Sequence, residues 1–451
     1  MIYFWKFSAP TGSMPDMGRF SPEIPHQELL QRRSACQARM EPGSVLILYT
    51  APKRIMSNDV HYRFRQDSDF YYLTGLPVEE GALVLSKDKM AVYVKPGSPE
   101  KETWEGPQPN LEETCEMSGI EDSRDLEALH KDLESWINGV SALYYSYGSD
   151  AARDQEVLGL SQRLLIRGRA GTSGPYRIVH PALLLHELRL IKSDWEVQRM
   201  KATAAITAQA HKEIIQAARP GMGEYELESI LHKVFRSHNA VEAYPSIVAG
   251  GGRACVLHYI KNDEILKDGD LVLMDAAAAQ GYIHSDVTRT FPVNARFTEP
   301  QKELYSIVLK AQKKAIESSV VGATMDSVHD DAVSILVDGL KDLGLVKESK
   351  DEALAKKTYR RFYMHRTGHW IGYDVHDVGS YYLDGQARRF EAGMACTVEP
   401  GLYIPGHDDI PEPYRNTGIR IEDDIVITKG APLNLTSEVP VEIEQIEELK
   451  C

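Results

Sequence analysis

Short hydrophobic runs alternate with amphipathic stretches in the first 180 residues of the chain. The hydrophobic runs are "SVLILY" (44–49), "GALVLS" (81–86), "MAVYVK" (90–95) and "SALYYSY" (141–147). Apolar residues recur at helical spacing over 26–40 and 125–139. Strands that alternate with helices predict an α/β domain over residues 1–180. We expect the first 20 or so residues to be partly disordered.

A second domain is predicted over residues 181–451, after the loop-like stretch "RGRAGTSGPYRIVHPA". Ser193 and Glu196 form an S-x-x-E capping box ahead of a long amphipathic helix. Beyond this helix, helical and β-type patterns are mixed. The helical patterns cover 224–238, 300–319 and 324–343, and the β-type patterns cover 270–276, 284–292, 394–399 and 418–427.

The composition indicates which binding partners and which cellular compartment to expect. The net charge is −15 and no run of lysine or arginine is present, which argues against nucleic acid or an anionic membrane as a partner. Five scattered cysteines without a CxxC pair are typical of a reducing compartment. No stretch approaches the roughly 18 apolar residues of a membrane span, and the N-terminus lacks a secretory layout. We expect a cytoplasmic protein.

Two aspartates follow each other closely in "DLVLMDAAAAQGYIHSDVTRTFPV" (270–293), which predicts a strand, a tight turn and a second strand. A turn at Gln280-Gly281 would set Asp275 directly opposite Asp286, with their Cβ atoms about 5 Å apart. Two carboxylates at that distance repel unless a cation lies between them or one carries a proton. The alternative is that both are solvated at strand ends.

Two glutamates add further acidic groups to the same half of the chain. Glu399 ends the β-type run in "GMACTVEPGLY", before Pro400 stops the ladder. Glu422 lies in the alternating stretch "TGIRIEDDIVI", where it shares a face with Arg420. A glutamate among β-branched residues is costly unless it is paired. The alternative to a metal is a surface salt bridge between Glu422 and Arg420 or a lysine.

Three histidines are concentrated in "MHRTGHWIGYDVHDVG" (364–379). His365 and His369 have the i,i+4 spacing of a zinc-binding pair, but Arg366 stands where an HExxH motif has glutamate, and two glycines disfavour a helix. Histidines of this kind are often only structural. Together with four carboxylates, however, they favour an acid-rich metal site. Such a site prefers Mn²⁺, with Co²⁺, Fe²⁺ or Zn²⁺ as alternatives.

The order of the candidate ligands along the chain resembles the ligand set of the pita-bread metallopeptidases, which include aminopeptidase P, prolidase and methionine aminopeptidase. The candidates are Asp275, Asp286, a histidine, Glu399 and Glu422. "YRFRQDSDFYYLTG" (62–75) is similar to the N-terminal domain of aminopeptidase P. The stretches "SIVAGGGRACVLHY", "SDVTRTFPV", "HWIGYDVHDVG", "TVEPGLYIP" and "GIRIEDDIVIT" resemble that subfamily's catalytic motifs. The tryptophan after His369 is closer to aminopeptidase P than to prolidase.

The resemblance implies an α/β N-terminal domain followed by an α+β pita-bread catalytic domain with two divalent metal ions. It places Asp275 at one metal position, Asp286 and Glu422 as bridges, and His369 and Glu399 at the second position. Glu399 would also serve as general base and then acid, and His376 would stabilise the oxyanion. His258 and His365 would line the substrate pocket, and Arg420 would stand behind the ligands.

The implied activity is metal-dependent removal of the N-terminal residue from peptides with proline at the second position. The implied assembly is a homodimer or homotetramer. Alternatives from the same scaffold are a prolidase that cleaves Xaa-Pro dipeptides, a creatinase-like hydrolase, or a binding protein without catalysis. The chain departs from the family pattern at Arg366, where glycine is common, and at Ala277 and Ala279, where "DAGxE" becomes "DAAAA". These departures bear on substrate preference and local backbone geometry.

Overall fold

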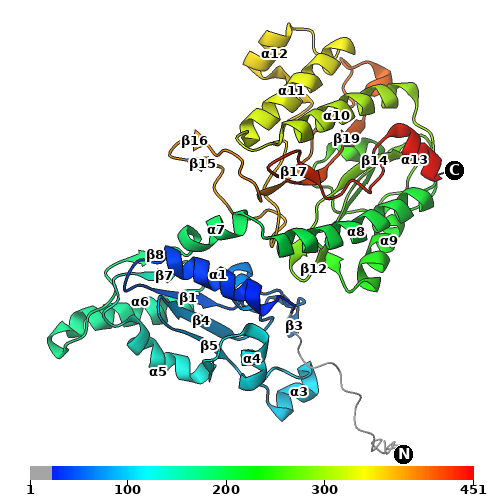
Figure 1. Cartoon of the computed structure of the whole chain (residues 1–451). Helices are drawn as coiled ribbons and strands as arrows, with labels where there is room; N and C mark the ends of the chain where they lie inside the picture. The colour runs from blue at the N-terminus through cyan, green and yellow to red at the C-terminus, as the bar shows by residue number, and fades with distance from the viewer. Residues whose placement is uncertain (1–22, 451) are drawn as a thin grey trace, which may run out of the picture. The chain divides into compact units, whose positions relative to one another are not determined.

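The computed structural model describes residues 23–450, and the chain divides into two compact units between Pro181 and Ala182 (Figure 1). The expected disorder of the first 20 residues concerns a segment that lies outside the described residues, as does Cys451. None of the helices formed by residues 23–450 has the length and hydrophobicity that crossing a bilayer requires.

The first unit is built on a six-stranded mixed sheet in the order β6-β5-β4-β1-β7-β8 (Figure 1). Its central strand β1 pairs antiparallel with β4 and parallel with β7. The elements are α1 (His26–Arg39), β1 (Val45–Tyr49), β2 (Ile55–Ser57), β3 (Val60–His61), α2 (Ser68–Thr74), β4 (Gly81–Ser86), β5 (Met90–Val94), α3 (Pro99–Glu105), α4 (Leu111–Ser118), β6 (Ser123–Asp125), α5 (Leu126–Ile137), β7 (Leu143–Tyr145), α6 (Ala151–Ile166), η1 (Arg167–Ala170) and β8 (Ile178–Val179). Buried residues of α5 and α6 pack on the hydrophobic runs of the sheet, which confirms the predicted α/β domain.

The second unit contains several short antiparallel sheets flanked by helices. Its elements are α7 (Ala182–Leu190), α8 (Asp194–Ala217), α9 (Glu224–Ser237), β9 (Val241–Glu242), β10 (Ile247–Gly250), η2 (Gly251–Cys255), β11 (Leu271–Asp275), β12 (Ala278–Gln280), β13 (Ile283–His284), β14 (Thr288–Pro292), α10 (Glu299–Ser318), α11 (Met325–Asp342), α12 (Lys350–Lys356), η3 (Thr358–Arg361), β15 (Tyr382–Leu383), β16 (Gln386–Ala387), β17 (Ala395–Val398), β18 (Gly401–Ile404), η4 (Glu412–Tyr414), β19 (Thr417–Arg420), β20 (Asp423–Val426), β21 (Leu433–Asn434) and α13 (Ile443–Lys450). Helices α8 and α9 lie on one side of the strands, and α10 and α11 lie on the other (Figure 1).

The predicted capping box at the start of α8 is present. The Glu196 amide donates to Ser193 Oγ at 3.2 Å, and the Ser193 amide donates to Glu196 Oε2 at 2.8 Å. These two bonds satisfy backbone donors that a helix start leaves without partners. The helix therefore begins where the sequence predicts.

Two predicted strands are interrupted, and an acidic residue stands at each interruption. The stretch 284–292 breaks between β13 and β14, and the Asp286 amide there donates to the Asp424 carboxylate at 3.1 Å instead of to a strand. The stretch 418–427 breaks between β19 and β20, and the Glu422 amide donates to the Thr288 carbonyl at 3.1 Å. The prediction of two continuous strands is therefore wrong at these points.

The predicted pairing of Asp275 with Asp286 is also wrong, by two residues. Asp275 pairs with Thr288, and the tight turn consists of Gly281 and Tyr282, both with positive φ. A two-residue turn with positive φ at both central positions usually carries Asn or Gly, so a tyrosine there gives no sequence signal. In this register Asp286 lies opposite Ala277 and remains on the same face as Asp275, as a diagonal neighbour.

Candidate metal centre

A cavity of about 1090 Å³ lies within the second unit. All nine residues predicted for the site line it: Asp275, Asp286, His369, Glu399, Glu422, His258, His365, His376 and Arg420. These residues come from five separate stretches of sequence. The fold therefore brings the predicted set together around one space.

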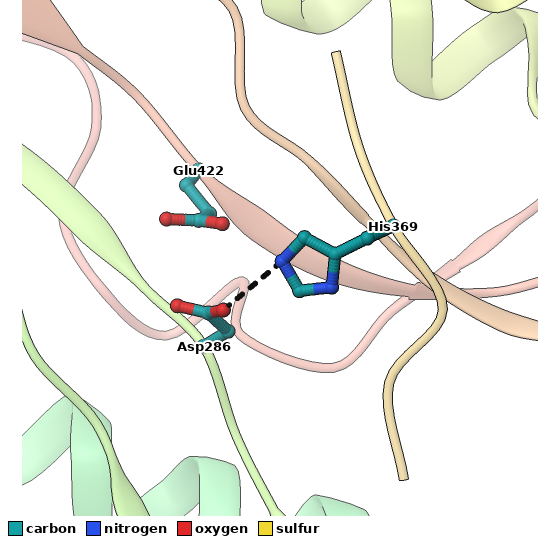
Figure 2. A group of neighbouring side chains, drawn as sticks. All are labelled: Asp286, His369 and Glu422. Carbon is teal, nitrogen blue, oxygen red and sulfur yellow. Dashed lines mark ion pairs between the residues drawn. The ribbon is translucent and has the colours of Figure 1, made fainter. Parts of the chain in front are cut away.

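Three of these side chains face one another at the centre of the site. Asp286, His369 and Glu422 each offer a ligand atom, and these atoms all lie within 4.8 Å of one another (Figure 2). His369 Nε2 is 3.3 Å from Asp286 Oδ2 (Figure 2). One imidazole with two carboxylates at this spacing is a donor set that a divalent cation accepts.

Asp275 and Glu399 flank this group. Glu399 Oε1 lies 3.7 Å from His369 Nε2. The Tyr244 hydroxyl connects the two aspartates, since it is 2.6 Å from Asp275 Oδ1 and 2.5 Å from Asp286 Oδ1. Sequence reasoning missed Tyr244, because a tyrosine before a proline in "VEAYPSIV" carries no acidic or histidine pattern.

The electrostatics of the site favour a bound cation. Burial, together with repulsion from the neighbouring carboxylates, raises the pKa of Asp275, raises that of Glu399 to about 7 and raises that of Glu422 well above its usual range. Burial alone would lower the pKa of His369, but the contacts with Asp286 and Glu399 raise it to about 9. Buried acids whose pKa is raised by neighbouring carboxylates are stabilised by a divalent ion, so the residues present fit a metal.

A close approach of two backbones places His369. A Cβ on Gly368 would lie well inside contact distance of the Thr397 carbonyl oxygen. Thr397 in β17 in turn donates its amide to the His369 carbonyl at 2.9 Å. Glycine at position 368 therefore allows the loop to lie against β17, the strand that ends just before Glu399.

Arg420 belongs to a hydrogen-bonded chain that leads away from the carboxylates. Its Nη2 donates to Asp275 Oδ2 at 2.6 Å, and its Nη1 donates to the Tyr403 hydroxyl at 3.0 Å. The Tyr403 hydroxyl in turn lies 2.8 Å from His365 Nε2. Burial, with Arg420 nearby, lowers the pKa of His365 to about 3, so this imidazole is neutral at physiological pH. Tyr403 is a second residue that sequence reasoning missed.

The alternative of a surface salt bridge for Glu422 is not what the structure shows. Glu422 is 2% exposed and accepts a hydrogen bond from Thr288 Oγ1 at 2.6 Å, while Arg420 pairs with Asp275. Glu422 is therefore a buried acid, and the salt bridge of Arg420 is made with Asp275 instead.

His376 and His258 line the cavity from positions outside the central group. The His376 ring meets the His369 ring edge-on at 4.4 Å between centroids. Both His376 and His258 are exposed to the cavity, where an entering molecule can reach them. They are therefore placed to contact a molecule that occupies the cavity.

A buried ion cluster supports the loop that carries His376. Asp377 accepts a hydrogen bond from Arg189 Nη2 at 2.6 Å and another from Lys192 Nζ at 2.7 Å. The three side chains are at most 2% exposed. Burial alone would raise the pKa of Asp377, but Lys192 and Arg189 lower it to about 2. The cluster ties the loop to the end of α7 and to Lys192 just after it, and sequence reasoning missed it.

Comparisons with known proteins agree with this architecture. The model of metallopeptidase family M24 matches residues 198–429, more than half of the chain. The chain belongs to metallopeptidase family M24. A second model, the aminopeptidase P N-terminal domain, matches residues 29–144. The predicted family and its two-domain fold, an α/β unit followed by an α+β pita-bread unit, are thus confirmed.

Individual members of family M24 resemble the chain over nearly its whole length. The Xaa-Pro aminopeptidase of Haemophilus influenzae is 40% identical over 95% of this chain and 98% of its own. Pseudomonas aeruginosa aminopeptidase PepP superposes with a TM-score of 0.92 at 39% identity, over 95% of this chain and 98% of its own. Zinc-substituted Escherichia coli aminopeptidase P, in complex with product, gives 0.91 at 38% over the same shares of the two chains. The family is described as one of metallopeptidases.

Proposed function

We propose that this chain is an Xaa-Pro aminopeptidase, which removes the N-terminal residue from peptides whose second residue is proline. The observation that carries the proposal is the convergence of Asp275, Asp286, His369, Glu399 and Glu422 on one cavity. Full-length similarity to proteins named Xaa-Pro aminopeptidase supports the substrate class over a dipeptide-specific prolidase. A binding protein without catalysis would not need five usable donors.

The donor set supports two divalent ions, with Mn²⁺ preferred and Co²⁺, Fe²⁺ or Zn²⁺ as alternatives. Asp275 would serve one position and His369 with Glu399 the other, while Asp286 and Glu422 serve both. Such ions lower the pKa of a bound water toward neutrality and so supply a nucleophile at cellular pH. The count and identity of the metal are open to direct measurement by elemental analysis.

The remaining steps fall to protein side chains. Glu399 accepts the proton of the attacking water and delivers it to the proline nitrogen as that nitrogen leaves. His376 donates a hydrogen bond to the carbonyl oxygen as negative charge develops there. His258 and His365 lie around the proline ring. Arg420 holds Asp275 through its ion pair.

Two further proposals concern the oligomeric state and the cellular location of the protein. We propose a homodimer or homotetramer, which light scattering on the purified protein would measure. We also propose a cytoplasmic location, which the free Cys36, Cys115, Cys255 and Cys396 support because thiols persist in reducing compartments.

Metal removal combined with a substrate panel tests the proposed activity. EDTA should abolish hydrolysis of an Xaa-Pro-Xaa tripeptide, and Mn²⁺ should restore it. Parallel assays with an Xaa-Pro dipeptide and a Met-Ala-Xaa peptide separate the activity from a prolidase and from a methionine aminopeptidase. Full turnover by protein that elemental analysis shows to be metal-free would refute the proposal.

A further inference from the structure

Arg366 stands at the rim of the cavity, three residues before His369. Its side chain is 55% exposed and forms an ion pair with Asp326 through Nη2. The Cα atoms of Arg366 and His369 lie at most about 10 Å apart, and both residues line the same cavity. This arginine stands at a position where the family commonly has glycine.

Three segments hold the Arg366–Asp326 pair in place. Asp326 lies in the first turn of α11, and the Tyr382 hydroxyl from β15 donates to Asp326 Oδ2 at 3.0 Å. Burial alone would raise the pKa of Asp326, but the hydrogen bonds from Arg366 and Tyr382 lower it below its usual value. Asp326 therefore remains an anion that orients the arginine, and all three residues line the cavity.

The guanidinium has donors to spare. A guanidinium carries five N–H donors. Within residues 23–450, the side-chain contact of Arg366 is the one from Nη2 to Asp326. The other arginine among the described lining residues, Arg420, is buried and engaged with Asp275, Tyr403 and Thr288, and no lysine lines the cavity there. A carboxylate that enters the cavity would therefore find its cationic donor in Arg366.

We propose that Arg366 is a specificity-determining residue that binds a carboxylate of the substrate at its third residue. This inference rests on the proposed function, because it assumes that proline occupies the second position. An extended peptide places the carboxyl group of its third residue about 7 Å beyond the scissile carbonyl, a distance that an arginine at the rim can bridge. The carboxylate is either the C-terminus of a tripeptide or an acidic side chain at position three, and guanidinium geometry suits both.

The test compares three substrates on three proteins. The substrates are Ala-Pro-Gly, Ala-Pro-Gly-amide and Ala-Pro-Glu-amide, which carry a terminal carboxylate, no carboxylate and a side-chain carboxylate. The proteins are the Mn²⁺-loaded wild type, Arg366→Gln and the matched control Arg361→Gln. Arg361 is also an exposed arginine, paired with Asp409 at 2.6 Å, but it lies outside the cavity lining.

The wild type should favour a carboxylate-bearing substrate over the uncharged amide by roughly 10- to 100-fold in kcat/KM, as expected for a hydrogen-bonded charge pair. Arg366→Gln should reduce this preference to about one by raising KM for the carboxylate-bearing substrates. Arg361→Gln should keep the full preference. Preference for Ala-Pro-Gly identifies the terminus as the source of the carboxylate, and preference for Ala-Pro-Glu-amide identifies the side chain.

An equal preference in wild type and Arg366→Gln would overturn the inference while leaving the aminopeptidase activity intact. If neither protein cleaves any of the three substrates, the proposed function fails instead. Calorimetry with Pro-Gly, Pro-Glu-amide and Pro-Gly-amide then measures the carboxylate preference without turnover. Loss of that preference in Arg366→Gln supports the inference, and an unchanged or absent preference overturns it. Thermal unfolding of both variants shows whether they are folded.

Discussion

Replacing Asp377 with asparagine removes the anion of a buried cluster while keeping its shape. Arg189 would then keep its ion pair with the partly exposed Asp374, and Lys192 would face an uncharged partner in a place that is closed to solvent. Removal of one partner from a buried ion pair costs about 3–5 kcal/mol, because the remaining charges cannot recover hydration. The second unit should therefore unfold at a lower temperature.

The lowered pKa of Asp377 gives a second value for the stability that the cluster contributes. A fall from 3.8 to about 2 corresponds to roughly 2.5 kcal/mol of stability. Because the pKa is lower in the folded state, this stability is present above pH 4 and is lost as the pH falls toward 2. Both routes give a few kcal/mol, which corresponds to a decrease in Tm of roughly 6–20 °C for a domain of this size.

Differential scanning calorimetry at pH 7 measures this change in Asp377→Asn. The control is Asp338→Asn, which breaks the exposed ion pair with Lys350 and should leave the Tm within about 2 °C of wild type, since exposed pairs contribute little. Turnover below the unfolding temperature should fall by up to about 100-fold, because His376 is displaced. A Tm equal to that of the control would show that the cluster does not support this loop.

Two further predictions concern the ligands. Asp286→Asn should lose most of its bound metal and nearly all turnover, and an unchanged manganese content by elemental analysis would contradict its bridging role. Gly368→Ala should force the loop away from Thr397 and so move His369. A chelator competition should then show metal binding weaker by about 10- to 100-fold, as for other changes in residues that orient a metal ligand. A metal affinity equal to that of wild type would show that the close approach is not needed.

Much of this site follows from the sequence because its donors are unusual for their surroundings. Glu422 among isoleucines and Asp275 at the end of an apolar strand are each costly alone, and that cost indicated a cation. The helix beginning at Asp194 was predictable for a similar reason, since Ser193 and Glu196 satisfy backbone donors locally. Local chemistry of this kind is visible in a single stretch of sequence.

What the sequence could not provide depends on contacts between distant stretches. The turn at Gly281-Tyr282 has a tyrosine in a conformation that normally selects glycine or asparagine, so the register was misplaced. Tyr244 and Tyr403 act through partners more than fifteen positions away. The Asp377 cluster joins residues 185 positions apart or more. No periodicity along the chain reports such pairs.

The four proposed acidic ligands lie where strands stop, and this position separates folding from the proposed metal binding. Asp286 and Glu422 occupy interruptions, Glu399 follows the last residue of β17, and Asp275 is the last residue of β11. The ladders on either side are complete without these side chains. The scaffold should therefore keep its architecture when the ions are chelated, and a change in the acids should alter which ion is held before it alters the fold. Metal choice in this enzyme can thus vary independently of its backbone, unlike in a zinc finger, where the ion is needed to fold the chain.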